Sequence, residues 1–405
     1  MTVTVEDVRA AAVRIRDHVQ RSPMPKSDAL SHDLGMHLYV KLENLQRTGS
    51  FKERGAANKL AQLTPEERKR GVICSSAGNH AQGVAYHARR LGIPATVVMP
   101  ETSPLVKVRA TLGFGAEVIL YGAAYDDAYA KAREVEAERN LVFVHAFDDV
   151  AIIAGQGTIG LEILEDLPNV DAIVLAVGGG GLAAGVGAVV KALKPDTRII
   201  GVEMVNIASM KAALENGGPI TLPAASTIAD GIAVRRVGAE SYAHVKKYVD
   251  EIVTVDEEEV ANAILQLIEK EKTVAEGAGA APIAALLNRD LGLKGKRVVA
   301  GICGGNINVN LVSRIIERGL IKDGRRVRLK ATMPDRPGQL ARLLDVVAKA
   351  RANVLEVHHE RMSKKLSLID TEVALVLETR GPEHIDELIA ILADAGFSAS
   401  KVDLA

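Results

Sequence analysis

Residues 172–190 read AIVLAVGGGGLAAGVGAVV, a run without charge that contains six glycines. Ala172 to Val177 has the continuous apolar composition of a buried β-strand, and the residues after the four consecutive glycines favour a helix. The run is nearly long enough to cross a membrane, but its central glycines favour a strand, a turn and a helix instead. This succession is typical of a parallel α/β sheet.

Strands and helices alternate on both sides of this run. Further strand-like segments are 72–74, 95–99, 117–121, 142–144, 198–203 and 297–303, with helical patterns at 81–91, 107–112 and 126–138. The alternation predicts mostly parallel sheet covered by helices on both faces, with ligands at the carboxyl ends of the strands. Val5 to His18 is predicted to be an amphipathic helix and lacks the features of a secretory signal.

The pattern changes near Asp323. From Val327 the predicted elements are a strand (327–333), a helix (340–350), two strands (353–360 and 370–378), a helix (382–395) and a strand (397–402). This βαββαβ order is that of a ferredoxin-like unit. We therefore expect a catalytic domain at 1–322 and a second domain at 327–405.

The composition narrows the class of protein. The 405 residues are 48% apolar and 25% charged, with a formal net charge of −1. This is ordinary globular composition, and the balanced charge argues against nucleic-acid and membrane partners. Cys74 and Cys303 are far apart and show no CxxC spacing, which favours a reducing, cytoplasmic location over a disulfide framework or a zinc site.

Four consecutive glycines, Gly178 to Gly181, connect the strand and the helix of the opening run. Their amides could wrap an anion such as a phosphate, and the helix dipole would add to the attraction. The residues also fit the dinucleotide fingerprint G-x-G-x-x-A, with Glu203 ending the next strand about 20 residues later. On these residues alone, a site for a single phosphate group and a site for a dinucleotide remain alternatives.

Two further loops carry candidate functional groups. Residues 75–80, SSAGNH, offer amides at a helix N-terminus, which suits a carboxylate or phosphate, although an ordinary capped turn has the same composition. Lys52 lies in SFKERG at 50–55 and is either a solvated surface lysine or a partly desolvated nucleophile.

Together these loops resemble the fold-type II pyridoxal-phosphate (PLP) enzymes of the threonine/serine dehydratase family. The matching stretches, in the family's order, are KLENLQ (41–46) with SFKERGA (50–56), SAGNHAQG (76–83), GGGGL (178–182) and CGGN (303–306). The dinucleotide hypothesis explains only one of these matches. The resemblance implies a tryptophan synthase β-like α/β fold with two open twisted sheets, in which a smaller lobe at about 45–150 is inserted in the larger lobe.

The resemblance also implies roles for individual residues. Lys52 would hold PLP covalently and act as the base on substrate Cα, with PLP as the electron sink. The other implied cofactor contacts are Phe51 at the ring, Asn79 at the phenolic oxygen, Gly178, Gly179, Gly180, Gly181 and Leu182 at the phosphate, Gly231 through its backbone, and Cys303 at the pyridine nitrogen. The substrate carboxylate would bind at Ser76, Ala77, Gly78, Asn79 and His80.

The implied reaction is the β-elimination of L-threonine to 2-oxobutanoate and ammonia, and of L-serine to pyruvate. Ala77 stands where related serine racemases carry a serine, so we expect little racemisation. A serine or 3-hydroxyaspartate dehydratase is the alternative within the fold. From other classes, an NAD-dependent dehydrogenase would use Glu203 for ribose, and a non-catalytic amino-acid sensor need not retain Lys52.

Two accessory sites follow from the resemblance. Glu203 would hold a monovalent cation, because the positions around Ile207 and Ser209 lack the acidic ligand that a divalent ion needs. The C-terminal unit resembles an ACT domain at Met333 to Leu340 and at Asn353. It implies an isoleucine or valine effector between two copies in a homodimer or homotetramer, and a domain that only pairs subunits is the alternative. The implied effector residues are Asp335, Gly338, Gln339, Leu340 and Asn353. Both a catabolic role and a role in isoleucine biosynthesis fit.

Overall fold

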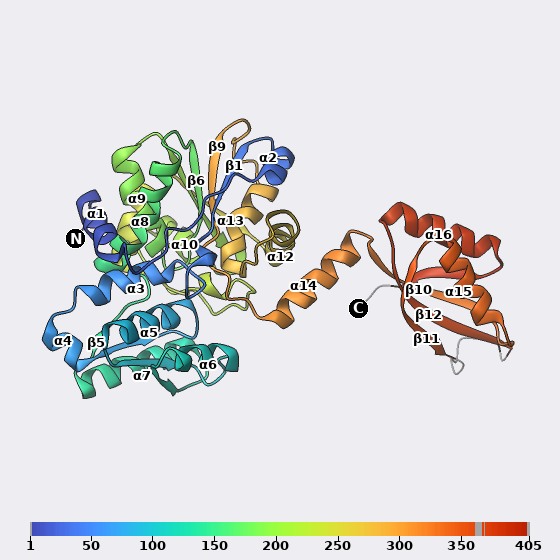
Figure 1. Ribbon diagram of the computed structural model, residues 1–405, viewed down its shortest axis with the longest axis horizontal. Helices are drawn as coiled ribbons and strands as arrows, with labels where there is room; N and C mark the ends of the chain where they lie inside the picture. The colour runs from blue at the N-terminus through green and yellow to red at the C-terminus, as the bar shows by residue number, and fades with distance from the viewer. Residues whose placement is uncertain (1, 361–366, 368, 403–405) are drawn as a thin grey trace. The chain divides into compact units, whose positions relative to one another are not determined.

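Two parallel sheets form the first of two units in the chain (Figure 1). The computed structural model describes residues 2–360, 367 and 369–402, and it divides into units 1–307 and 308–405. The larger sheet has the order β1-β9-β6-β7-β8, and all of its neighbouring strands are parallel. Its strands are β1 (His37–Lys41), β9 (Arg297–Gly301), β6 (Ala172–Ala176), β7 (Arg198–Met204) and β8 (Glu251–Val255).

Helices cover both faces of the larger sheet, with α9 on one face and α13 on the other (Figure 1). The helices of this lobe are α1 (Val5–Ile15), α2 (Asp28–Leu34), α8 (Val150–Asp166), α9 (Gly181–Leu193), α10 (Ser209–Asn216), α11 (Ala239–Tyr248), α12 (Glu257–Gln266) and α13 (Gly277–Asn288). Short helical turns are η1 (Glu43–Leu45), η2 (Val205–Ile207), η3 (Asp230–Ile232) and η4 (Leu267–Glu271). Residues 172–190 therefore form β6, a glycine turn and most of α9, as predicted. In the described part of the chain, no helix is both long and apolar enough to cross a membrane.

The smaller sheet has the order β4-β3-β2-β5 and is also parallel. Its strands are β2 (Val72–Ser75), β3 (Ala95–Met99), β4 (Glu117–Leu120) and β5 (Val142–Phe143); the helices of this region are α3 (Lys52–Ala61), α4 (Pro65–Arg70), α5 (Asn79–Leu91), α6 (Leu105–Gly113) and α7 (Tyr125–Arg139). These strands lie between β1 and β6 in sequence, so the polypeptide leaves the larger sheet and returns to it.

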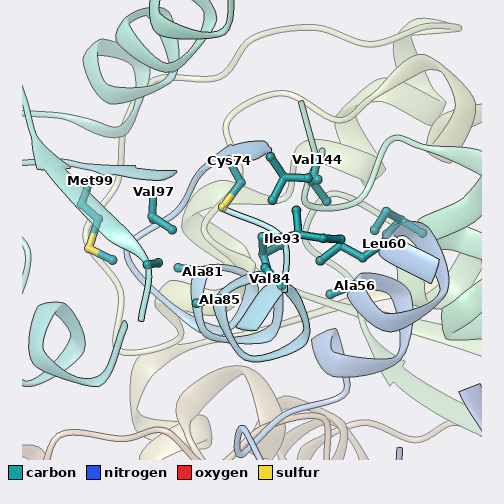
Figure 2. Packing of buried hydrophobic residues seen from close by; sticks show 14 of the residues in the cluster. Ala56, Leu60, Cys74, Ala81, Val84, Ala85, Ile93, Val97, Met99 and Val144 are labelled. Carbon is teal, nitrogen blue, oxygen red and sulfur yellow. The ribbon is translucent and has the colours of Figure 1, made fainter. Parts of the chain in front are cut away.

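Small apolar residues let α3 and α5 pack closely on the smaller sheet (Figure 2). Cys74 of β2, Val97 of β3, Val84 of α5 and Leu60 of α3 belong to one hydrophobic cluster, and all four are fully buried. The packing fixes the ends of β2, α3 and α5, and the loops predicted to be functional start from these ends. Cys74 is thus a small apolar core residue.

The second unit has an antiparallel sheet in the order β11-β12-β10-β13, which is the ferredoxin-like arrangement that we predicted. Its elements are α14 (Val309–Lys322), β10 (Arg326–Pro334), α15 (Gln339–Lys349), β11 (Asn353–Glu360), β12 (Asp370–Glu378), α16 (Pro382–Asp394) and β13 (Ser398–Val402). Leu343 of α15 and Leu388 of α16 are buried against Leu329 and Leu375 of the sheet. By its contacts, α14 groups with this unit, although residues 309–322 lie within the expected catalytic domain at 1–322. Residues 403–405 of the predicted second domain lie outside the described residues.

Candidate active site

Lys52 begins α3 and lies against the loop that follows β9. The amide of Phe51 donates a hydrogen bond of 3.0 Å to the carbonyl of Cys303, which joins the two segments. Lys52 Nζ donates a hydrogen bond of 2.7 Å to the carbonyl of Ala146. The same nitrogen lies 5.2 Å from the ring centroid of Phe51 and 6.0 Å from that of Phe147. The structure thus brings the predicted Lys52, Phe51 and Cys303 together.

The environment of Lys52 favours its neutral amine. Burial lowers the pKa of Lys52 to about 8, while Cys303 and Glu276 act in the opposite direction. An amine of this kind serves as nucleophile and base near neutral pH. Burial also lowers the pKa of His80 to about 3, helped by the charge of Lys52, and His80 Nε2 lies 2.9 Å from the carbonyl of Val144. We assign His80 as neutral, with this nitrogen as the donor.

The glycine loop presents backbone amides without acceptors. Gly178, Gly179, Gly180, Gly181 and Leu182 are all buried, and none of their amides has a hydrogen-bond acceptor among the described residues. The N-terminus of α9 has no side-chain cap. Buried amides of this kind are rare without a partner, and together with the helix dipole they suit an anion such as a phosphate. This observation fits the predicted phosphate site.

The side chain of Phe147 packs against the backbone of this loop. A Cβ on Gly179 would lie 2.2 Å from Cγ of Phe147, and Gly180 has a left-handed φ of 93°. Phe147, which also lies against Lys52, therefore connects the glycine loop to the amine. His145 holds this segment, because its Nδ1 accepts hydrogen bonds from the amides of Phe147 and Asp148 at 3.2 and 2.8 Å.

The second predicted loop joins β2 to α5. Ser76, Ala77, Gly78 and Asn79 are half-buried, and α5 begins without a side-chain cap. The amide of Gly78 donates to Ser76 Oγ at 3.2 Å, whereas those of Ala77, Asn79 and His80 have no acceptor among the described residues. These three amides are suited to a carboxylate, as predicted for the substrate.

Glu276, at the start of α13, is a site residue that the sequence analysis missed. It is 5% exposed, and its Oε1 accepts a hydrogen bond of 2.6 Å from Asn79 Nδ2. A Cβ on Gly304 would lie 2.2 Å from this oxygen, and one on the predicted Gly231 would lie 3.4 Å from it. The close approach requires glycine at position 304, and the run GAGAA at 277–281 was the available signal in the sequence.

Cys303 contributes a neutral thiol to the site. It is buried and free, and burial raises the pKa of its thiol well above the ordinary value. A thiol that stays protonated is consistent with the predicted place beside a pyridine nitrogen, where an aspartate would instead hold a proton on the ring.

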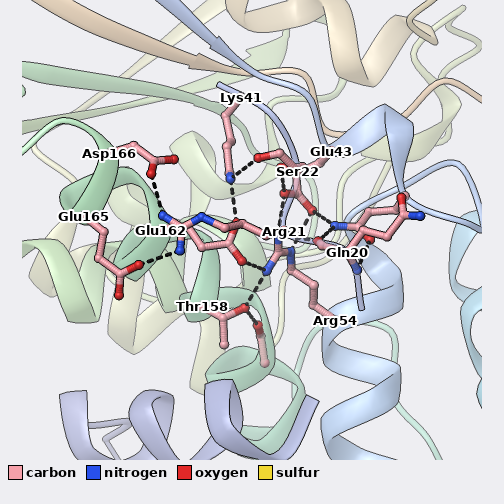
Figure 3. A network of polar contacts seen from close by, with 12 residues as sticks. Gln20, Arg21, Ser22, Lys41, Glu43, Arg54, Thr158, Glu162, Glu165 and Asp166 are labelled. Atoms are coloured by element: carbon pink, nitrogen blue, oxygen red, sulfur yellow. Dashed lines mark hydrogen bonds and ion pairs between the residues drawn. The ribbon is translucent and has the colours of Figure 1, made fainter. Parts of the chain in front are cut away.

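A buried ion network anchors the helix that carries Lys52 (Figure 3). Arg54, which is 1% exposed, donates to both oxygens of Glu43 at 2.7 Å and to Glu162 at 2.6 and 2.9 Å. Lys41 pairs with Glu162 at 2.5 Å. Burial alone would raise the pKa of Glu43, but Arg54 holds it below the ordinary value. The network connects α3 to η1, β1 and α8.

Glu203, the predicted cation ligand, caps a helix. Its two oxygens accept hydrogen bonds of 2.8 Å from the amides of Met210 and Lys211, in the first turn of α10. No group of three or more His, Cys, Asp or Glu side chains in the described part of the chain is arranged for a metal ion. The monovalent cation at Glu203 stays a prediction.

The predicted effector residues do not gather within one copy of the second unit. Asp335 and Gly338 follow β10, and Gln339 and Leu340 open α15, whose N-cap Gly338 has a φ of 87°. Asn353 starts β11. In the register of the sheet, Asn353 lies opposite Glu378, whereas Pro334, at the end of β10, lies opposite Asp370. Asn353 is therefore at the other end of the sheet.

Comparison with known proteins defines the class. The family model described as pyridoxal-phosphate dependent enzyme matches residues 15–304. The chain belongs to this family, which confirms the predicted cofactor and removes the dinucleotide alternative. The unsatisfied glycine-loop amides and the lowered pKa of Lys52 are independent features of the site that fit PLP.

Individual proteins that are similar to the chain give a more specific comparison than the family model does. The chain is 49% identical over 400 residues to the L-threonine ammonia-lyase of Thermotoga maritima, covering 99% of this chain and 100% of the relative. The processed form of threonine deaminase isoform 2 from Solanum lycopersicum is a structural neighbour, with 37% identity, a TM-score of 0.73 and coverage of 78% of this chain and 95% of that one. Maize serine racemase is another, with 31% identity, a TM-score of 0.74 and coverage of 80% and 99%.

Proposed function

We propose that the chain catalyses the PLP-dependent β-elimination of L-threonine to 2-oxobutanoate and ammonia, with L-serine to pyruvate as a second activity. The observation that carries the proposal is the position of Lys52, whose Nζ lies 6.0 Å from the ring centroid of Phe147 and whose pKa is lowered by burial to about 8. Phe147 also packs against the glycine loop. The near-complete coverage of a relative named L-threonine ammonia-lyase supports threonine as the substrate.

The residues of the chain would bind the reactants and move the proton. The amides of 178–182 would hold the cofactor phosphate, and those of Ala77, Asn79 and His80 the substrate carboxylate. Bound PLP supplies the electron sink that makes the Cα–H bond acidic. Lys52 would remove this proton, and burial of its amine, which lowers the pKa to about 8, favours the neutral form that a base needs. Ala77 offers no acid to the opposite face of Cα, so the D-amino acid is not formed in quantity.

A ketoacid assay with L-threonine, L-serine and 3-hydroxyaspartate tests the substrate. We expect the highest kcat/KM with threonine, lower activity with serine, and no activity in Lys52→Ala. Lys69→Ala, on the exposed surface of α4, is the matched lysine control and should keep full activity. A preference for 3-hydroxyaspartate, or no ketoacid from threonine, would contradict the proposal.

We further propose that the second unit binds isoleucine or valine in a homodimer or homotetramer. In support, Gly338 leaves the start of α15 without a side-chain cap. Because Asn353 lies at the opposite end of the sheet, a site that combines it with Gly338 needs two copies. Light scattering and calorimetric titration with each amino acid test this, and a monomer that binds neither would overturn it.

We also propose a cytoplasmic location, because both cysteines are free thiols.

A further inference from the structure

Glu276 is a buried carboxyl group that forms no salt bridge with any of the described residues. Among the described residues, the side chain of Glu276 has one hydrogen-bond partner, the neutral amide of Asn79, at 2.6 Å. Burial therefore raises the pKa of Glu276 to about 7. Burying a carboxyl group without a cation lowers the stability of a fold, so its retention here points to a functional reason.

The side-chain amide of Asn79 forms hydrogen bonds through both its nitrogen and its oxygen. Its Oδ1 accepts a hydrogen bond of 2.7 Å from Asn306 Nδ2, which also donates to the carbonyl of Thr48 at 2.8 Å. A carbonyl only accepts, so Thr48 fixes the orientation of Asn306, and Asn306 fixes that of Asn79. Nδ2 of Asn79 then faces Glu276 with one hydrogen, and its second hydrogen stays available to a ligand.

Glycines at positions 279 and 304 allow Glu276 and Asn79 to lie close together. A Cβ on Gly304 would lie 2.2 Å from Oε1 of Glu276 and 3.1 Å from Nδ2 of Asn79. A Cβ on Gly279 would lie 2.3 Å from the carbonyl of Gly304. Glycine at both positions lets the start of α13 approach the loop after β9, and this approach delivers the carboxyl group to Asn79.

We propose that Glu276 is a positioning residue, which together with Asn306 holds Asn79 with its amide nitrogen, and not its oxygen, toward the bound cofactor. The proposal rests on the assignment of Asn79 to PLP and does not require threonine to be the substrate. An N–H directed at the phenolic oxygen of the cofactor favours the deprotonated form of that oxygen, whereas an amide oxygen in its place would repel it.

The test is the titration of apo-protein with PLP, followed by absorbance, together with the unfolding midpoint of each apo-protein. Glu276→Met removes the acceptor at similar volume and is expected to weaken PLP binding about threefold to tenfold, the effect of one hydrogen bond. It should also raise the unfolding midpoint, because an unpaired carboxyl group is removed. Glu276→Gln keeps an acceptor oxygen and should bind PLP nearly as wild type does. The exposed Glu66→Ala is the control for general effects.

A double-mutant cycle separates positioning from a direct role. In an Asn79→Ala background, Glu276→Met should cause no further loss of PLP affinity, because Glu276 acts through Asn79. The proposal is overturned if Glu276→Met weakens PLP binding equally with and without Asn79. It is also overturned if Glu276→Met lowers the unfolding midpoint and leaves PLP affinity unchanged. Wild-type PLP binding is measured without substrate, so these outcomes are distinct from a failure of threonine turnover.

Discussion

Lys107 and Asp230 form an ion pair between the two lobes of the first unit. Nζ of Lys107, on α6 of the smaller lobe, lies 2.6 Å from Oδ2 of Asp230, on η3 of the larger lobe. Both charges act on Glu276. Burial is the main cause of its raised pKa, and Asp230 adds to it, while the hydrogen bond from Asn79 and the charges of Lys107 and Lys52 oppose it.

Substitutions of the two partners should therefore move the pKa of Glu276 in opposite directions. Asp230→Asn removes a like charge and lowers this pKa from about 7, and Lys107→Ala removes an opposite charge and raises it. The shifts should be on the order of a few tenths of a pH unit, because Asp230 is exposed and screened. The pH dependence of PLP affinity near neutrality measures them. Shifts of the same sign, or shifts that persist in Glu276→Gln, would count against this electrostatic account.

Gly179→Ala is expected to damage the phosphate site. The new Cβ would lie within 2.4 Å of three ring atoms of Phe147, so the ring or the loop must move. Overpacking of this kind costs about 1–3 kcal/mol of unfolding free energy. PLP affinity should fall by about tenfold or more, because a displaced loop no longer directs its amides at one anion. Gly218→Ala, where a Cβ would meet nothing within 4 Å, is the control, and equal behaviour of the two variants would refute the prediction.

Ala77→Ser is expected to create racemase activity. Ala77 lies in the half-buried loop before α5, where a hydroxyl could protonate the face of Cα opposite Lys52. A positioned acid contributes about 100-fold or more to a proton transfer, so formation of D-serine from L-serine should rise at least about tenfold. Chiral chromatography of the products measures it. No gain in D-serine would show that the loop does not face Cα in this way.

Arg54→Met should strongly destabilise the first unit. It leaves Glu43, which is 1% exposed, without its bidentate partner, and removing one member of a buried ion pair costs about 3–5 kcal/mol. Denaturant unfolding followed by circular dichroism measures the loss. The exposed Arg9–Glu6 pair provides the comparison, since Arg9→Ala should cost less than about 1 kcal/mol. Similar losses in both variants would mean that the network does not anchor α3.

Most of the fold could be predicted because its strands are short apolar runs between clear helical patterns. Ala95 to Met99 was predicted as a strand and is β3, and 353–360 and 370–378 are β11 and β12. The ends of elements do not follow from the sequence pattern, because tertiary contacts decide them. The predicted strand at 297–303 ends at Gly301, and Cys303 lies in the loop beyond it, where its carbonyl accepts from Phe51.

The site could be predicted only where a run of residues carries the signal. The glycine loop and the SSAGNH loop have such runs, and the structure shows their free amides at helix starts. Glu276 is a single acidic residue whose proximity to Asn79 comes from the packing of α13, 197 positions away in sequence. The ion pair of Lys107 with Asp230 and the ring of Phe147 were missed for the same reason.

The central claim is that Lys52 carries the cofactor. The direct measurement is borohydride reduction of the holoenzyme, followed by peptide mapping by mass spectrometry. We predict one phosphopyridoxyl group per chain, on the peptide that contains Lys52, and its absence in Lys52→Ala. A colourless protein, or a label on any other lysine with Lys52 unmodified, would contradict the account.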